Sequence, residues 1–211
     1  MGFYRSVVLP RFCDLSMRSK RLGPYRHRAV AGAKGRTLEI GAGSGLNLAL
    51  YPPAVTEIIA LEPDPNLIAM AEPKARNAPR PVRFVEASAE SIPLPDESVE
   101  TVITTWTLCT IPDPHRALEE MKRVLRRDGT LTFVEHGLSS EPGVQKWQHR
   151  LAPAWRRLTG GCHLNRPIAE LVRSAGFELK KLETGYVRGP KIMTFMYEGS
   201  ATRGSDIPSS A

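Results

Sequence analysis

The sequence predicts an α/β protein with a doubly wound, mostly parallel sheet. From Arg36 onward, short β-rich segments alternate with segments of helical periodicity, and strands separated by helices form parallel βαβ units. A glycine-rich turn at residues 41–45 follows the first predicted strand directly. Two β-rich segments near the C-terminus predict a hairpin, which requires one antiparallel strand. A chain of 211 residues suits one domain with a modest addition.

The elements of the first two thirds follow this alternation. The first strand covers residues 37–40, and a helix begins near Leu46, after the glycine turn. A second strand, 57–61, precedes a helix with Pro65 in its first turn, where the missing N–H costs little. The next predicted elements are strands over 82–86 and 99–105, a helix over 113–127 and a strand over 130–134.

The last third predicts a helix and then the hairpin. The helix covers residues 166–175 and is closed by Gly176. Strands over 177–186 and 191–197 follow. Residues 199–211 are rich in Gly, Ser and Thr, so we expect a disordered tail there.

The chain is basic because of its N-terminal segment. Residues 1–36 contain nine Lys and Arg against one acid, Asp14, which gives +8, whereas the net charge of the whole chain is +7. Such a segment could lie on an anionic membrane, cover an active site or bind nucleic acid. A first helix that packs an apolar stripe on the domain explains the same pattern. Because the basic excess is confined to this segment and no RNA-binding module is appended, we do not expect a nucleic-acid partner.

Cysteine usage and hydropathy favour a soluble protein in a reducing compartment. The three cysteines are Cys13, Cys109 and Cys162. They are far apart in the sequence and lack the spacing of zinc-finger cysteines. His149 and His163 have no carboxylate or thiol at the spacing of a metal site, so no metal site is expected. No segment approaches the roughly 18 apolar residues of a membrane span, and the N-terminus does not resemble a cleaved signal peptide. We expect a cytoplasmic monomer or dimer, with peripheral contact between residues 1–36 and an anionic membrane as an alternative.

The glycine turn suggests a nucleotide-like cofactor. Without side chains, the backbone can turn sharply and approach a ligand closely. Glu62 ends the second predicted strand, where a carboxylate can accept both hydroxyls of a ribose. A dinucleotide is the alternative cofactor. Loops that bind dinucleotides follow the pattern GxGxxG/A, but this chain has Leu46 in the sixth position, where the pattern requires Gly or Ala. Glu39 would repel a pyrophosphate and could instead hold a cationic amino-acid group, so both features disfavour a dinucleotide.

Four motifs in order resemble class I S-adenosylmethionine-dependent methyltransferases. Residues 38–45 (LEIGAGSG) are similar to their first motif, and residues 61–64 (LEPD) to their second. Residues 85–95 resemble the segment beside the adenine, and 113–131 the helix and turn before the fifth strand. The resemblance covers about residues 30–198. It implies a Rossmann-like, seven-stranded sheet of order 3-2-1-4-5-7-6, with S-adenosylmethionine as cofactor and S-adenosylhomocysteine as product.

The resemblance also implies the residues that bind the cofactor. They are Glu39, Gly41, Ala42, Gly43, Asn47, Glu62, Pro63, Ser88, Ala89, Thr105 and Trp106. Many relatives have Gly-Asp-Ala where this chain has residues 87–89 as Ala-Ser-Ala. The hydroxyl of Ser88 therefore replaces a carboxylate that contacts the adenine amino group. Domain boundaries follow: a basic helical cap over 1–35, the methyltransferase domain over 36–198 and the tail over 199–211.

The methyl acceptor should bind at the carboxyl ends of the strands, as ligands do in open α/β sheets. His136 and Glu135 follow the fifth predicted strand and are candidate general bases, although each could equally hydrogen-bond a loop. Residues 143–165 are interpreted as a cap that shapes the acceptor pocket, and a plain packing helix is the alternative. The pocket residues that we assign are Cys109, Trp147, Trp155, His163 and Asn165.

Within the type 11 methyltransferases, the chain looks most like a narrower group. This group comprises small membrane-associated enzymes that methylate alkyl thiols, and their bacterial relatives. The similar segments are residues 104–112, residues 134–137 and the segment from Trp147 to Asn165. This implies S-methylation of a small lipophilic acceptor. A thiol needs little base catalysis, since its pKa near 8.5 leaves some thiolate at neutral pH. The alternatives are N-methylation of a phospholipid amine such as phosphatidylethanolamine, C-methylation of a quinone precursor, and a nucleic-acid-binding protein.

Overall fold

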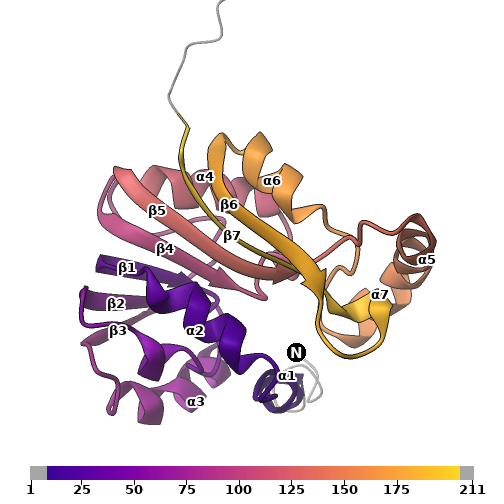
Figure 1. Cartoon of the computed structure of the whole chain (residues 1–211). Helices are drawn as coiled ribbons and strands as arrows, with labels where there is room; N and C mark the ends of the chain where they lie inside the picture. The colour runs from indigo at the N-terminus through magenta and orange to yellow at the C-terminus, as the bar shows by residue number, and fades with distance from the viewer. Residues whose placement is uncertain (1–8, 205–211) are drawn as a thin grey trace, which may run out of the picture.

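Seven strands form one mixed sheet in the computed structural model, which describes residues 9–204. The strands are β1 (Gly35–Ile40), β2 (Val55–Leu61), β3 (Val82–Val85), β4 (Val99–Thr105), β5 (Leu125–His136), β6 (Phe177–Tyr186) and β7 (Phe195–Arg203). Their order is β3-β2-β1-β4-β5-β7-β6, and β7 runs antiparallel to both of its neighbours (Figure 1). The predicted fold class, strand order and antiparallel strand are confirmed.

Helices cover both faces of this sheet. They are α1 (Leu9–Met17), α2 (Gly23–Ala31), α3 (Pro65–Ala75), α4 (Pro114–Val124), α5 (Pro142–Leu158), α6 (Ile168–Ser174) and α7 (Lys191–Thr194), with a 3-10 turn, η2, at Leu48–Leu50. Both α3 and α4 begin with an aspartate cap: Asp64 accepts a hydrogen bond from the N–H of Asn66, and Asp113 accepts one from that of Arg116. No helix within residues 9–204 is both long and apolar enough to cross a membrane.

Two hydrophobic cores result, one on each face. Leu38 and Ile40 of β1 pack with residues of α4 and α6, whereas Ile58 of β2 packs with residues of α2 and α3. Side chains alternate between the faces of a strand, so Glu39 lies opposite Leu38 and Ile40, on the side of α2. The sheet thus presents a buried carboxylate beside the glycine turn.

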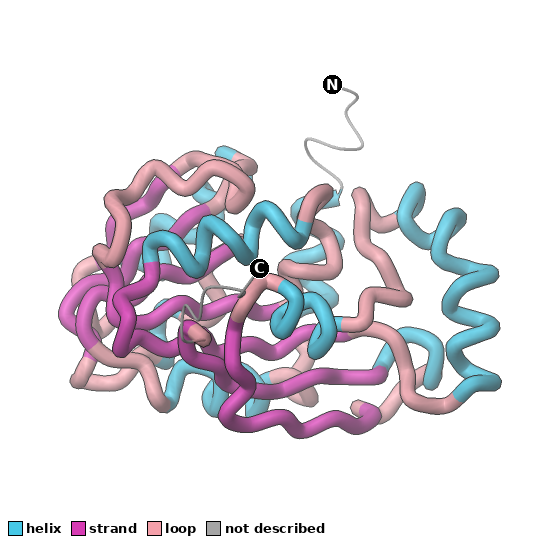
Figure 2. Tube along the Cα trace, turned by 90° about the horizontal axis from the view of Figure 1, so that it is seen from above, coloured by secondary structure: helices cyan, strands magenta, loops and turns pink. Residues whose placement is uncertain are grey.

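The described part of the N-terminal segment packs on the domain. Asp14 of α1 accepts a hydrogen bond from the hydroxyl of Ser44, so α1 covers the glycine turn. Arg28 of α2 binds both carboxylate oxygens of Glu198 on β7, at 2.7 and 2.8 Å. α5 instead projects beyond the carboxyl end of β5, as Figures 1 and 2 show. Residues 1–8 lie outside the described part of the chain.

Several predicted boundaries are wrong. The helix expected near Leu46 is only the 3-10 turn η2, and the helix over 113–127 ends at Val124 because the chain enters β5 at Leu125. Residues 191–194 form α7, and the strand that follows continues to Arg203. The tail therefore does not begin at Gly199. β7 lies between β5 and β6, so its backbone pairs on both sides, and this pairing outweighs the weak strand propensity of residues 199–203. The predicted disorder of 205–211 falls outside the described residues.

Candidate active site

The glycine turn after β1 has the backbone geometry of a ligand cradle. Gly41, Gly43 and Gly45 all have positive φ, between 56° and 75°. A Cβ at Gly41 would overlap Thr107, and one at Gly45 would overlap Leu48. At Gly43 the nearest heavy atom would be 3.9 Å away, so this glycine borders open space. Two of the glycines thus serve packing, and Gly43 leaves room for a group that approaches the backbone.

Glu62 holds this turn from the end of β2. One carboxylate oxygen accepts a hydrogen bond from the N–H of Gly43 at 2.9 Å, and the other accepts one from the N–H of Asp64 at 3.1 Å. The side chain is buried, and burial raises the pKa of Glu62. Pro63 is exposed beside it. The acid predicted to hold a ribose therefore lies against the turn predicted to receive the cofactor.

Glu39 lies at the centre of a buried polar network beside the turn. Its two oxygens accept hydrogen bonds from the side-chain amide of Asn47 at 2.7 Å and from the Tyr51 hydroxyl at 2.8 Å. The same amide of Asn47 donates to Thr105 at 3.1 Å, and Asn47 accepts a hydrogen bond from Arg26 at 2.9 Å. Burial raises the pKa of Glu39 to about 7. The structure thus brings together Glu39, Asn47 and Thr105, three of the residues predicted to bind the cofactor.

Arg26 and Tyr51 also belong to this network, although no sequence pattern predicts either of them. Arg26 is one of nine basic residues in the N-terminal segment, and nothing in its local sequence distinguishes it from the others. Its guanidinium also lies 4.8 Å from the centre of the Trp106 ring. Tyr51 follows η2 and is buried. Tertiary packing, and no local sequence pattern, brings each of these two side chains to the site.

Trp106 has a strained backbone at the end of β4. Its φ is +52°, a conformation that non-glycine residues rarely adopt, and its N–H donates to the carbonyl of Val134 at 2.8 Å. Such strain clusters at functional sites. Trp106 and His136 border a cavity of about 230 Å³ between the N-terminal helices and the β6–β7 connection. Its other lining residues are partly apolar and partly polar: Met17, Leu22, Val187, Met193 and Met196, with Ser19, Arg21, Arg188 and Thr194.

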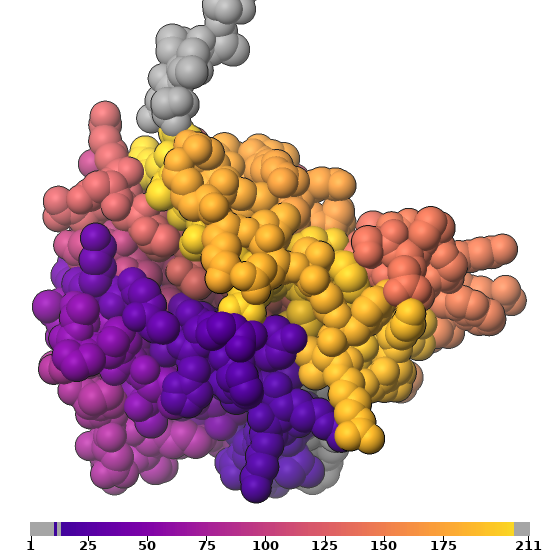
Figure 3. All heavy atoms as spheres, in the orientation of Figure 1, coloured from indigo at the N-terminus to yellow at the C-terminus, as the bar shows by residue number. Residues whose placement is uncertain are grey.

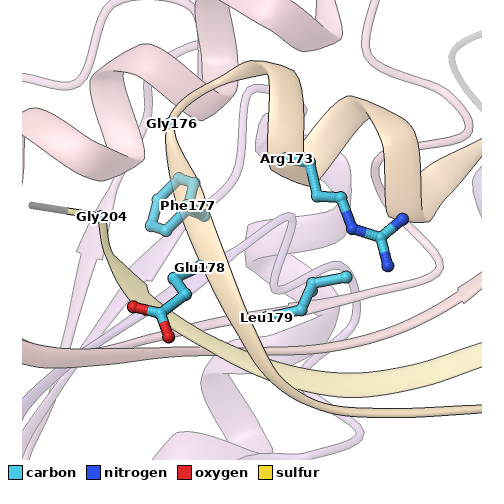
Figure 4. Close-up of a pocket in the computed structure, with 6 residues that line it drawn as sticks. All are labelled: Arg173, Gly176, Phe177, Glu178, Leu179 and Gly204. Carbon is cyan, nitrogen blue, oxygen red and sulfur yellow. The ribbon is translucent and has the colours of Figure 1, made fainter.

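A larger cavity, of about 620 Å³, lies at the opposite edge of the sheet. It is lined by residues at the end of α6 and the start of β6, including Arg173, Phe177 and Glu178 (Figure 4). It contains none of the predicted site residues. Ligands of open α/β sheets bind at the carboxyl ends of the strands, so the smaller cavity is the better candidate for an acceptor pocket.

The two candidate bases have different surroundings. The Nε2 atom of His136 lies 2.9 Å from the Sγ atom of Cys162, and His136 borders the cavity. Glu135 is fully buried and does not line it. One oxygen of Glu135 accepts hydrogen bonds from the Thr104 hydroxyl at 2.8 Å and the Thr107 N–H at 3.0 Å. Glu135 thereby connects the ends of β4 and β5, which sets the position of the loop that carries Trp106.

The cap residues do not assemble into one pocket. Trp147 lies on α5 with 54% of its surface exposed, whereas Trp155 is half-buried. Asn165 contacts His149 at 2.9 Å on the exterior. His163 contacts the carbonyl of Cys109 through its backbone N–H at 2.8 Å and its ring at 3.1 Å. Cys109 is buried close to Cys162 and His136, so it is the one predicted pocket residue that lies beside the cavity-lining histidine.

The remaining predicted contacts lie at the end of β3. Ser88 donates a hydrogen bond to the carboxylate of Glu90 at 3.0 Å and accepts one from the N–H of that residue at 3.2 Å. Ala89 is buried in the core, and Ala42 is buried within the glycine turn. The hydroxyl of Ser88 is therefore engaged in a local turn, and its role toward an adenine stays a prediction.

Comparison with known proteins agrees with this geometry. A model of the methyltransferase domain matches residues 38–133, which span β1 to β5. Human thiol S-methyltransferase TMT1B is 32% identical over 192 residues, which cover 85% of this chain and 76% of the human protein. The chain belongs to the S-adenosylmethionine-dependent methyltransferases.

Further relatives of this methyltransferase differ in name and in coverage. Rat TMT1B is 35% identical over 154 residues, and the match spans only 61% of the rat protein. Phosphatidylethanolamine N-methyltransferase of Cereibacter sphaeroides is 32% identical over 127 residues, which cover 58% of this chain and 62% of that enzyme. The crystal structure of Bacillus subtilis YcgJ superposes with a TM-score of 0.66 over 87% of this chain and 98% of that chain, at 17% identity. The last likeness concerns the fold alone.

Proposed function

We propose that this methyltransferase transfers the methyl group of S-adenosylmethionine to a small lipophilic thiol. The observation that carries the proposal is the cavity beside Trp106 and His136, whose lining includes three methionines together with polar residues such as Arg21 and Arg188. Methionine side chains adapt to acceptors of varied shape. The relatives named thiol S-methyltransferases match most of this chain and support the same substrate class.

The cofactor would occupy the space between the glycine turn and this cavity. Gly43 offers backbone in open space, and Glu62 offers a carboxylate for the two ribose hydroxyls. The negative charge of Glu39 favours the cationic methionine end of the cofactor. Trp106 contacts Arg26 of this network and also lines the cavity, so we place the sulfonium methyl beside Trp106.

The reaction needs positioning more than proton transfer. The acceptor sulfur attacks the methyl carbon in line, the new S–C bond forms, and the bond from the methyl to the sulfonium breaks. The products are a thioether and S-adenosylhomocysteine, and the thiol proton leaves to solvent. Holding the two reactants in line can supply on the order of 7–11 kcal/mol. A thiol with a pKa near 8.5 provides some thiolate at neutral pH.

The test measures release of S-adenosylhomocysteine with three acceptors. A short alkanethiol, the alcohol of the same chain length and phosphatidylethanolamine vesicles are assayed side by side with the full chain. We expect turnover with the thiol and none with the alcohol or the vesicles. Turnover with vesicles alone would replace the proposal by lipid N-methylation, for which the Cereibacter sphaeroides relative is the argument. Cofactor binding without turnover on any acceptor would also overturn the thiol assignment.

We further propose that α5 places the enzyme on an anionic membrane surface, where lipophilic acceptors accumulate. Its exposed apolar residues are Trp147, Leu151 and Leu158, with 54%, 36% and 65% of their surfaces exposed. The spacings of four and seven residues put all three on one helix face. The sequence of α5 contains four basic residues and no acid. Figure 3 shows that α5 projects from the body of the molecule. An exposed apolar stripe beside cationic side chains is typical of interfacial helices.

Vesicle co-sedimentation tests this role. Replacing Trp147, Leu151 and Leu158 together by serine should weaken binding to phosphatidylserine-containing vesicles at least about tenfold, since each side chain loses apolar burial. Thermal stability should fall only slightly, because Trp147 and Leu158 are more than half exposed and only Leu151 is mostly covered. The matched control is Leu15→Ser on α1, a residue with 72% exposure. If the control releases the enzyme and the α5 variant binds normally, the membrane contact belongs to the N-terminal segment instead.

A further inference from the structure

Three soft donor groups that are far apart in the sequence meet beside the cavity. Cys109 follows β4, His136 ends β5 and Cys162 lies in the loop after α5. One ligand atom from each, the two Sγ atoms and a ring nitrogen, lie within 4.8 Å of one another. The closest pair is His136 Nε2 and Cys162 Sγ, at 2.9 Å. The sequence alone predicts no metal site, because no two of these residues have the spacing of a zinc motif.

We propose that Cys109, His136 and Cys162 bind one zinc ion and leave its fourth position open. Thiolate and imidazole are the donors that zinc prefers, at about 2.3 Å for sulfur and 2.0–2.1 Å for nitrogen. In a tetrahedron with these bond lengths, the ligand atoms lie about 3.4–3.8 Å apart. The His136–Cys162 pair, at 2.9 Å, is closer than this and the other pairs lie within 4.8 Å, so the side chains shift when they bind an ion. Three protein ligands with one open position are typical of catalytic zinc sites.

A buried arginine lies beside the cluster. Arg166 is buried, and its guanidinium donates a hydrogen bond to the carbonyl of Leu108, next to Cys109. Within residues 9–204, no carboxylate lies at ion-pair distance from this guanidinium. The acid beside His136 is Glu135, and Thr104 and Thr107 hold one of its oxygens. Arg166 is thus a buried cation beside the cluster.

We place the open position on the side of the acceptor cavity, and this part of the inference rests on the proposed function. His136 lines the cavity together with Trp106, so a ligand in the cavity can reach an ion bound to His136. An acceptor thiol that binds the zinc releases its proton to solvent and becomes a zinc-bound thiolate. Its sulfur then attacks the sulfonium methyl, and the neutral thioether, a weaker ligand, leaves. Zinc would therefore make a general base unnecessary. His136 would bind the zinc and would not act as the general base.

Metal binding is measured on the full chain without any acceptor. The protein is stripped with a chelator under a phosphine reductant, then titrated with zinc and, separately, with cobalt(II). We expect one metal per chain and a cobalt spectrum with a sulfur-to-metal charge-transfer band and tetrahedral ligand-field bands. Cys109→Ser and Cys162→Ser should each lose more than about 100-fold in affinity, beyond the 10–100-fold typical of outer-shell changes. His149→Ala, an exposed histidine outside the cluster, should bind normally.

Two readouts separate the possible failures. Cofactor binding by calorimetry should be unchanged in Cys162→Ser, which shows that this variant is folded. An octahedral cobalt spectrum, or full affinity in both serine variants, would overturn the zinc site. Adding the alkanethiol to the cobalt form should shift the charge-transfer band. If the metal binds but the thiol causes no shift, the open-position role is wrong. A failed methylation assay with the metal bound would overturn the proposed acceptor alone.

Discussion

Replacing Glu62 by glutamine should raise the dissociation constant for S-adenosylmethionine about 100-fold. Hydrogen bonds from ribose hydroxyls to a carboxylate are charge-assisted and contribute about 1.5–3 kcal/mol each. Glutamine keeps one acceptor oxygen, so the expected loss is about 2.7 kcal/mol, which corresponds to 100-fold. The amide also places a donor near the N–H of Gly43 or that of Asp64, which weakens the hold on the glycine turn. Isothermal titration calorimetry measures the change.

The matched control for this variant is Glu57→Gln on the same strand. Glu57 forms ion pairs with Arg36 at 3.1 Å and Arg83 at 3.3 Å, and these pairs are solvent-accessible. Exposed ion pairs contribute about 0–1 kcal/mol, so this variant should lose little stability and no cofactor affinity. If Glu62→Gln changes the dissociation constant less than threefold, the ribose does not bind at the end of β2.

Replacing Glu39 by glutamine should stabilise the free protein at neutral pH and weaken cofactor binding. Burial raises the pKa of Glu39 from 4.5 to about 7, so the folded state prefers the protonated acid. Stability therefore falls as pH rises from about 4.5 to 7, where only the unfolded chain has released the proton, and the loss levels off above 7. The pKa difference corresponds to about 3 kcal/mol, and glutamine removes this loss. Chemical denaturation between pH 5 and 8 should show the difference growing up to pH 7.

Cofactor affinity should increase as pH rises, whereas protein stability should decrease. The ionised carboxylate of Glu39 attracts the cationic cofactor, so the wild-type enzyme should bind more tightly as pH rises through 7, and the glutamine variant should not. The other charged or titratable groups that face Glu39 are Arg26, Tyr51 and Glu62. Arg26 attracts the carboxylate and Glu62 repels it, and the pKa of about 7 includes both effects.

Glu120→Gln provides a control of opposite sign. Its hydrogen bonds with Arg123 lower the pKa of Glu120, so the folded state prefers the ionised acid. The stabilisation is present above about pH 4.5 and is lost as pH falls through the lowered value. Glu120→Gln should therefore destabilise the protein at neutral pH and leave cofactor affinity unchanged. If Glu39→Gln destabilised the protein in the same way, the carboxylate of Glu39 would be ionised at neutral pH in the free enzyme.

The sequence by itself determined the fold class, the cofactor and the residues that we propose to bind it. The glycine turn and Glu62 could be found because the chemistry of each is local: a turn needs positive φ at a few successive residues, and an acid ends the next strand. The strand order also followed, since four motifs in order resemble one family. Glu39 and Asn47 belong to the same short stretch of chain, so their meeting was predictable as well.

Only the tertiary structure decided how distant segments meet. Cys109, His136 and Cys162 converge because β4 and β5 are neighbours in the sheet and the loop after α5 folds back over their carboxyl ends. Arg26 reaches Asn47 because α2 packs across the same face, and Trp147 is exposed because α5 leaves the body of the fold. Strand pairing on both sides extends β7 to Arg203, against the local propensity. Each depends on contacts between residues that are far apart in the chain, and local patterns of hydrophobicity or spacing do not encode such contacts.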